Sequence, residues 1–189
     1  MIRDLILQNR SYRRFHQEVA ITEETLRELV DLARYSASAT NRQALKYMLS
    51  CDSEKNALIF QTLTWAAALK DWPGPAEGER PSAYIIILLD KEIAQAAGCD
   101  HGIAAQSILL GAAEKGLGGC MLGSAKRDDL RNNLNIPEQY DIVLVVALGK
   151  PAEKVVLETL EPGQPFAYWN DSESVHHVPK RRLDDIIIG

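Results

Sequence analysis

AYIIILL, residues 83–89, is the stretch that decides the fold. It is aliphatic throughout and lacks the polar alternation of a strand that faces water on one side, so it predicts a central strand covered on both faces. A second run of the same kind spans residues 142–148. Because helices must supply the covers, we expect an α+β protein with three layers, α/β/α, in which a small mixed, mainly antiparallel sheet lies between helices.

Helical periodicity predicts the segments that cover the sheet. Ile2, Leu5 and Ile6 indicate a short first helix. Thr22 is a good N-cap for the clearest helix, and Gly116 is the natural C-cap of a helix that is apolar on nearly all sides. That apolar helix should be buried in the middle of the fold or at a subunit contact. The other helices expected span residues 22–36, 56–70, 102–115 and 126–134.

The rest of the chain is predicted to hold one more strand, loops and an arm. Residues 47–51 are expected to form the strand, and the small polar residues 36–41 a loop. Beyond about residue 153 the chain is long and polar and contains several prolines. We therefore expect an extended C-terminal arm with little regular structure before a last segment near residues 183–188.

The composition is that of an ordinary soluble domain, with 189 residues, 46% hydrophobic side chains and a net charge of −5. A chain of this length can bury a single core, so residues 1–189 are expected to form one domain. The acidic balance argues against nucleic-acid binding, which needs a continuous basic face. The longest apolar runs fall far short of the ~20 residues that span a bilayer, and no apolar signal region follows Met1, so we expect a cytoplasmic protein.

Cysteine usage indicates neither a disulfide framework nor a zinc site. Cys51, Cys99 and Cys120 are odd in number, far apart and outside any C-x-x-C spacing. We expect these cysteines to be small buried hydrophobic side chains.

Two basic clusters near opposite ends of the chain point to an anion. The first contains Arg10, Arg13 and Arg14, and the second spans residues 180–182. If the termini meet, the clusters form one anion site, because guanidinium groups match the geometry of phosphate. Ser11 would add a hydroxyl donor that suits a phosphate ester. The alternative from charge alone is a solvated basic face.

Other chemical signals are weaker. The glycine run at residues 116–119 lacks the strand and helix of a dinucleotide fingerprint, so it either turns the chain at a helix end or lets backbone approach a ligand. Asp100 and His101 could form an acid/base pair, but a helix-start Asp beside a packing His is favoured. His176 and His177 lie in the expected irregular tail, without further metal ligands at useful spacing.

Segments along nearly the whole chain, in order, resemble motifs of the FMN-dependent nitroreductase family. NRSYRRF, residues 9–15, resembles that family's R-R-S-x-R-x-F motif. SASATNRQ, residues 36–43, resembles its A-P-S-x-x-N-x-Q-P-W loop. The other matching segments are DHG at 100–102 with GLGGCMLG at 116–123, NIP through LGKP at 135–151, and VPKRRL at 178–183.

The resemblance implies a nitroreductase-like fold, a bound FMN and a homodimer with two FMN sites at its interface. The loop at residues 36–43 would then reach the flavin bound mainly by the other subunit. No catalytic side chain is implied, because N5 of the flavin takes and gives the hydride. The phosphate would be held by Arg10, Ser11, Arg13, Lys180 and Arg182, the ribityl chain and pyrimidine edge by Ser38, Asn41 and Gln43, and the ring would lie along Met121, Leu122 and Gly123.

The implied activity is ping-pong transfer from NAD(P)H, or another reductant, to a nitroaromatic, quinone or similar acceptor. Two alternatives stay open: a specialised flavin enzyme of the same fold, for dehalogenation or flavin fragmentation, and a flavin-binding dimer without turnover. Residues 65–80 match no family pattern. Asn9, Ala37, Ala44 and Leu45 also depart from the family motifs, which usually have Arg, Pro, Pro and Trp there.

Overall fold

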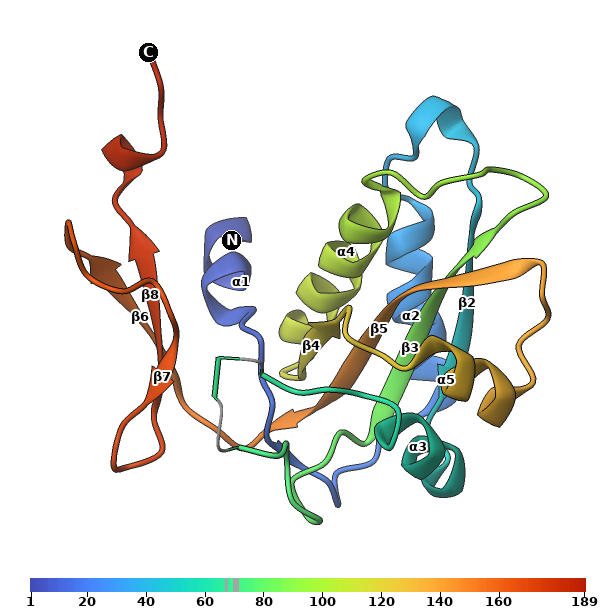
Figure 1. The fold of residues 1–189 in the computed structure, drawn as a ribbon, viewed down its shortest axis with the longest axis horizontal. Coiled ribbons are helices and arrows are strands. Elements are labelled where there is room, and N and C mark those ends of the chain that lie inside the picture. The colour runs from blue at the N-terminus through green and yellow to red at the C-terminus, as the bar shows by residue number, and fades with distance from the viewer. Residues whose placement is uncertain (67, 70–71) are drawn as a thin grey trace.

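Strand β3, Ala83–Asp90, lies at the centre of the main sheet, and all of its residues are buried. The computed structural model describes residues 1–66, 68–69 and 72–189. Strand β3 pairs with β2, Leu45–Ser50, on one side and with β5, Tyr140–Pro151, on the other (Figure 1). The far edge of β5 pairs with β4, Gly118–Leu122, and with the short β1, Phe15–His16. The central strand predicted from residues 83–89 is therefore confirmed.

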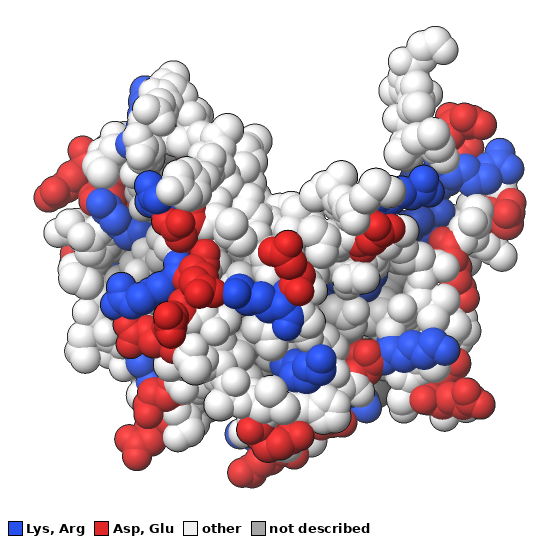
Figure 2. All heavy atoms as spheres, turned by 180° about the vertical axis from the view of Figure 1, so that it is seen from behind, with Lys and Arg blue, Asp and Glu red and all other residues white. Residues whose placement is uncertain are grey.

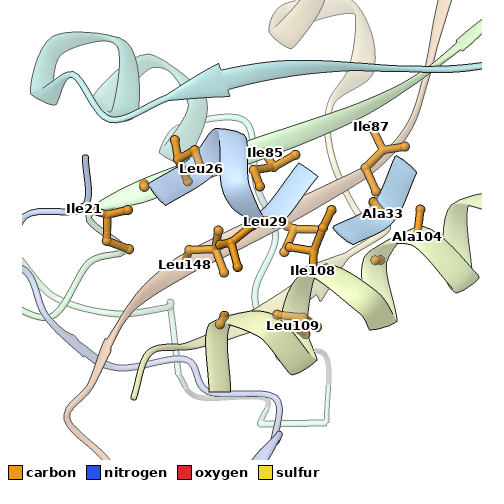
Figure 3. Close-up of a cluster of buried hydrophobic side chains, with 14 residues drawn as sticks. Ile21, Leu26, Leu29, Ala33, Ile85, Ile87, Ala104, Ile108, Leu109 and Leu148 are labelled. Atoms are coloured by element: carbon orange, nitrogen blue, oxygen red, sulfur yellow. The ribbon is translucent and has the colours of Figure 1, made fainter. Parts of the chain in front are cut away.

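Two helices cover each face of this sheet. On one face lie α2, Glu23–Arg34, and α4, Asp100–Glu114, which pack on Ile85 and Ile87 of β3 (Figure 3). On the other face, α3, Ser53–Phe60, and α5, Arg127–Leu134, cover the alternate residues Tyr84, Ile86 and Leu88. The three-layer α/β/α arrangement is thus confirmed, and every pairing between described strands of this sheet is antiparallel.

Local signals set the helix ends where side chains can satisfy free backbone groups. The hydroxyl of Thr22 accepts from the N–H of Thr25 at 3.1 Å and begins α2, as its sequence predicts. Gly116 follows α4 with φ +67°, a conformation that glycine adopts without steric cost. The short first helix is also present, as α1, Ile2–Gln8.

The predicted helix over residues 56–70 is wrong in its extent. Helix α3 begins earlier, because Asp52 caps it by accepting from the N–H of Lys55 at 2.9 Å, and it ends at Phe60. The following residues pair instead with the chain before α5, through a bridge between Leu63 and Ala125. Residues 67 and 70 of the predicted helix lie outside the described residues.

The glycine run forms more regular structure than its sequence indicates. Only Gly116 turns the chain, while Gly118 and Gly119 belong to strand β4. The apolar helix α4 packs within its own chain, and a Cβ on Gly111 would come 2.3 Å from Leu32 of α2. The helix thus buries one side against its own chain, while Ile103 stays 40% exposed, and its expected place at a subunit contact stays a prediction.

The C-terminal arm is a small sheet, so the expectation of little regular structure there is wrong. Strand β8, His176–Arg181, pairs in parallel with β6, Val155–Leu160, and antiparallel with β7, Trp169–Asn170. Pro179 is tolerated because it lies beyond the end of the two-residue β7. The arm sheet stands apart from the main sheet, with α1 between them in the view of Figure 1. The last predicted segment is reduced to a 3₁₀ turn, Leu183–Asp185.

The cysteines and the charged surface agree only in part with the expectations from the sequence. Cys120 is buried, as expected, but Cys51 and Cys99 are exposed, and each lies just before a helix. On the face seen in Figure 2, Lys and Arg side chains are interspersed with Asp and Glu. Among the described residues, no helix is long and apolar enough to cross a membrane.

Candidate functional site

The two basic clusters meet at one pocket of about 340 Å³ between the N-terminal segment, α4, β4 and the arm. It brings together Arg10, Ser11 and Arg13 with Lys180, which lies on β8 some 170 positions later in the chain. Met121 of β4 also lines it. Five of the eleven predicted site residues thus share this space, which we call the basic pocket. Its lining is Asn9, Arg10, Ser11, Arg13, Gln106, Leu109, Met121, Tyr168, His176, Val178 and Lys180.

Glycines in β4 let the basic N-terminal segment lie directly against the sheet. Ser11 forms a parallel bridge with Gly119, and the N–H of Tyr12 donates to the carbonyl of Gly119 at 3.0 Å. A Cβ on Gly118 would come 2.4 Å from the ring of Tyr12, and a Cβ on Gly119 would come 2.4 Å from the carbonyl oxygen of Ala147. Only glycine fits both positions, so these glycines place Ser11 at the pocket.

Arg13 is held in place by the arm. Its Nη1 donates to Nε2 of His176 at 3.0 Å, and its guanidinium lies 4.6 Å from the centre of the Tyr168 ring. His176 is 2% exposed, and its Nδ1 donates to the amide oxygen of Asn170 at 2.7 Å. Burial, with a smaller effect of the Arg13 charge, lowers the pKa of His176 to about 4. The neutral imidazole can therefore accept from Arg13 at neutral pH.

A partly buried carboxylate links the same segment to the start of the arm. Glu153 accepts hydrogen bonds from the backbone N–H of Arg13 and, at 3.1 Å, from that of Arg14. Burial raises the pKa of Glu153, and these two donors and the arginine charges oppose that rise. The side chain of Arg13 thus remains available to the pocket while its backbone is tied to Glu153.

The pocket is suited to an anion. Arg10, Arg13 and Lys180 line it, and none of its described lining residues is acidic. The Nε of Arg10 is buried without a hydrogen-bond partner among the described residues, although its Nη2 donates to the carbonyl of Ile6. An unpaired buried guanidinium donor is costly, and a bound phosphate would satisfy it.

The second predicted group lies at a different pocket in this chain. Ser38 and Gln43 line a space of about 250 Å³ that shares no residue with the basic pocket. The hydroxyl of Ser38 donates to Asp100 at 2.7 Å and accepts from the N–H of Gln43 at 3.0 Å. Asn41 is exposed, and it and Gln43 have φ of 54° and 53°. This loop is strained and well fastened, which is typical of a binding loop.

Asp100 is engaged by this loop and not by its neighbour His101. Both oxygens of its carboxylate accept from the N–H of Ala39, and one also accepts from Ser38. Asp100 is the first residue of α4, so the helix-start interpretation is confirmed.

Four predicted residues lie outside both pockets: Asn41, which is described above, and Leu122, Gly123 and Arg182. The side chain of Leu122 points to the opposite face of β4, where it is buried in the core with Leu130, and its expected place along a ligand stays a prediction. Period-two alternation puts only Met121 on the pocket side. Gly123 is exposed beyond the end of β4. Arg182 is exposed on the arm, with its Nε 3.6 Å from Asp185.

Tyr168 and His176 are site residues that the sequence analysis missed. Both were assigned to an irregular tail, and neither forms part of a recognised motif. The signal that could have revealed His176 is the alternation of β8, which places His176, Val178 and Lys180 on one face.

The family model of the nitroreductase family matches residues 6–150. The chain belongs to the nitroreductase family. This confirms the resemblance and makes the protein an oxidoreductase of the nitroreductase type. The family model includes Arg10, Ser11, Arg13 and Met121 of the basic pocket and stops before the arm that supplies Lys180.

Relatives of the chain support the same assignment. The NADPH-flavin oxidoreductase of Vibrio harveyi is 24% identical and aligns with 97% of this chain and 77% of its own length. The solved structure of the Vibrio harveyi NADPH:FMN oxidoreductase, a complex with NAD⁺, matches with a TM-score of 0.63 and 25% identity, over 79% of this chain and 68% of that chain. A nitroreductase family protein of Streptococcus pneumoniae TIGR4 shares the fold over the whole of both chains, with a TM-score of 0.71 and 15% identity.

The pKa values of the adjacent arm residues His176 and His177 should shift in opposite directions. Asp171, at 3.1 Å, and Glu158, at 2.6 Å, raise the pKa of His177 above its ordinary 6.5, while that of His176 is lowered to about 4. The paired charge of His177 stabilises the arm fully below pH 6.5 and this stabilisation is lost as the pH rises through the raised pKa. NMR titration of the imidazole nitrogens checks the direction of both shifts. A His177 pKa below 6.5, or a His176 pKa near the ordinary value, would contradict these contacts.

Proposed function

We propose that this nitroreductase-family protein binds FMN in the basic pocket and catalyses NAD(P)H-dependent, two-electron reduction of a nitroaromatic, quinone or similar acceptor. The observation that carries the proposal is the meeting of Arg10, Ser11, Arg13 and Lys180 at one pocket, where Nε of Arg10 is buried without a partner among the described residues. Its cytoplasmic location stays a prediction.

The residues of the pocket fit the parts of FMN. A terminal phosphate needs several charge-assisted donors, which the two arginines, the lysine and the Ser11 hydroxyl can provide. A flat ring needs close apolar surface, and Met121 and Leu109 line the same space. The fit favours FMN over FAD, because the sequence carries no adenosine-binding fingerprint in the glycine run.

The protein's part in the reaction is to bind FMN and orient it. Bound FMN supplies hydride acceptance from NAD(P)H and hydride donation to the acceptor. Arg10, Arg13 and Lys180 would neutralise the phosphate, and His176 would keep the Arg13 guanidinium directed at it. Because His176 is neutral at neutral pH, it can accept from Arg13 without repelling the guanidinium.

We further propose that the flavin is held by two copies of the chain. In one chain, Ser38 and Gln43 line a pocket that is separate from the basic pocket. A second copy of the chain would therefore have to supply these two residues to the ribityl chain and pyrimidine edge of the flavin. The arm sheet, which stands apart from the main sheet, provides surface for a partner (Figure 1). Asn41, Gly123 and Arg182, exposed in one chain, are proposed to act at the same interface.

The purified protein should be yellow and contain FMN. The basic pocket suits a terminal phosphate, so heat release of the chromophore followed by chromatography should yield FMN. Release of FAD instead, or absence of flavin even after reconstitution with excess FMN, would overturn the proposal.

Anaerobic addition of NADH and NADPH separates the enzyme from a flavin-binding protein without turnover. For an enzyme, the absorbance of oxidised flavin should bleach and return when a quinone or nitroaromatic is added. Flavin that stays oxidised with both donors would contradict the proposed use of NAD(P)H, whereas the FMN content would still test the binding site by itself.

A further inference from the structure

A second polar pocket lies on the α3 side of the molecule and shares no residue with the basic pocket. It has a volume of about 220 Å³ and lies between α3, the start of β3 and the residues that follow β1. Arg80, Ser82 and Tyr84 line one side, and Phe60 and Cys51 lie on α3 and just before it. We call this space the Arg80 pocket.

Two buried polar atoms of this pocket have no partner among the described residues. They are Nε of Arg80 and the hydroxyl of Ser82. The guanidinium of Arg80 lies 4.5 Å from the centre of the Phe60 ring, and none of the described lining residues is acidic. A half-buried cation with no counter-charge in the described part of its pocket is costly, so its retention favours an anionic ligand.

The surrounding hydrogen bonds hold these donors in place. The amide oxygen of Gln17 accepts from the N–H groups of Gly78 and Arg80, at 2.8 and 3.2 Å. The buried Asn56 donates to the carbonyl of Ser82 at 2.8 Å, which fixes its backbone and leaves its hydroxyl free. The donors are therefore preorganised, which lowers the entropy cost of binding.

Tyr84 is the third polar side chain on this side of the pocket, with Arg80 and Ser82. It is 1% exposed, and burial raises the pKa of its phenol, which therefore stays a neutral O–H group. Arg80 lines the same pocket, and its charge partly opposes that rise. The rest of the lining is largely apolar, with Ala20, Ala57 and Pro81. A compact head with a short apolar skeleton fits such a pocket better than a fully hydrated anion.

We propose that the Arg80 pocket binds a small organic carboxylate. Arg80 pairs with the carboxylate, Ser82 donates to it, and the alanine and proline side chains contact the carbon skeleton. The Arg80 pocket shares no residue with the basic pocket, so a test of carboxylate binding does not depend on whether FMN binds.

Cys51 lines the pocket and reports on its occupation. The native protein is alkylated with iodoacetamide, a neutral reagent, and the modified peptides are quantified by mass spectrometry. Cys99, exposed and outside the Arg80 pocket, is the internal reference, while the pKa of the buried Cys120 is raised to about 11. The probes are benzoate, its neutral counterpart benzyl alcohol, and inorganic phosphate.

Benzoate should slow alkylation of Cys51 about tenfold once its concentration is about ten times the dissociation constant, and leave Cys99 unchanged. Arg80→Gln should abolish this protection, Ser82→Ala should weaken it, and Arg3→Gln, on the exposed surface of α1, should leave it intact. An unchanged Cys51 rate in each variant without benzoate shows that the pocket is still folded.

Four outcomes would overturn the proposal. No protection by benzoate, or protection that survives Arg80→Gln, would remove the site or the role of its cation. Equal protection by benzyl alcohol would mean that charge is not recognised. Equal protection by phosphate would replace the carboxylate by a simple inorganic anion.

Discussion

Replacement of Arg10 by alanine will weaken FMN binding about 10- to 150-fold. Arg10 lines the basic pocket and has a buried Nε without a partner among the described residues, so its guanidinium is available to the phosphate. Loss of a hydrogen bond to a charged group costs about 1.5 to 3 kcal/mol, which corresponds to this range of dissociation constants. Fluorescence titration of the apo protein with FMN measures the change.

Arg3→Ala is the matched control, because Arg3 lies on the same N-terminal segment but is exposed and outside the pocket. Lys180→Ala should weaken binding in the same direction as Arg10→Ala. Arg182→Ala tests whether an arginine outside the pocket of one chain contributes through a second copy. Dissociation constants unchanged by both Arg10→Ala and Lys180→Ala would make the basic clusters a solvated face.

Gly119→Ala will destabilise the fold by about 3 kcal/mol, because it overpacks a site closed by backbone. A Cβ there would come 2.4 Å from the carbonyl oxygen of Ala147 and 2.6 Å from Leu109, and the carbonyl cannot rotate away as a side chain can. Any movement of the β4 backbone that relieves this clash would also displace Ser11, which bridges to Gly119. Urea denaturation of the apo protein measures the free energy of unfolding.

Gly123→Ala is the control for this substitution. Gly123 follows the same strand, its φ is not positive, and a Cβ would meet nothing within 4 Å. Its unfolding free energy should change by no more than about 0.5 kcal/mol, as is usual for surface positions. Equal effects of the two alanines would contradict the close packing of Gly119 against Ala147 and Leu109.

The layers of the fold could be predicted because their signals are local and strong. Residues 83–89 are aliphatic without alternation, and only a strand buried on both faces of a sheet suits them. Thr22 marks a helix start because its hydroxyl accepts from a backbone N–H three residues later. Gly116 marks a helix end because glycine adopts the positive φ of the turn there without steric cost. Such signals need no knowledge of the rest of the chain.

Elements that depend on distant partners were missed. Gly118–Leu122 is a strand because β5 offers it an edge, and its glycines hide the β pattern. The segment after Phe60 leaves the helix because it pairs near Ala125. The arm strands likewise depend on pairing between residues about 20 apart, and the prolines obscured them.

The candidate site was predicted in its chemistry more than in its geometry. Charge indicated an anion, but the meeting of Arg10 with Lys180 depends on the course of the whole chain. The resemblance to nitroreductases supplied that connection. It could not supply His176 and Tyr168, which hold Arg13 through contacts specific to this arm.

Sedimentation of the holo protein, with flavin and protein absorbance followed together, tests most directly whether FMN lies in a site shared by two chains. The account predicts one boundary at about 42 kDa, twice the 21.0 kDa chain, that carries both signals. On dilution, the flavin signal should leave the protein as the 21.0 kDa species forms. A 21.0 kDa species that retains stoichiometric FMN would contradict both the shared site and the proposed dimer.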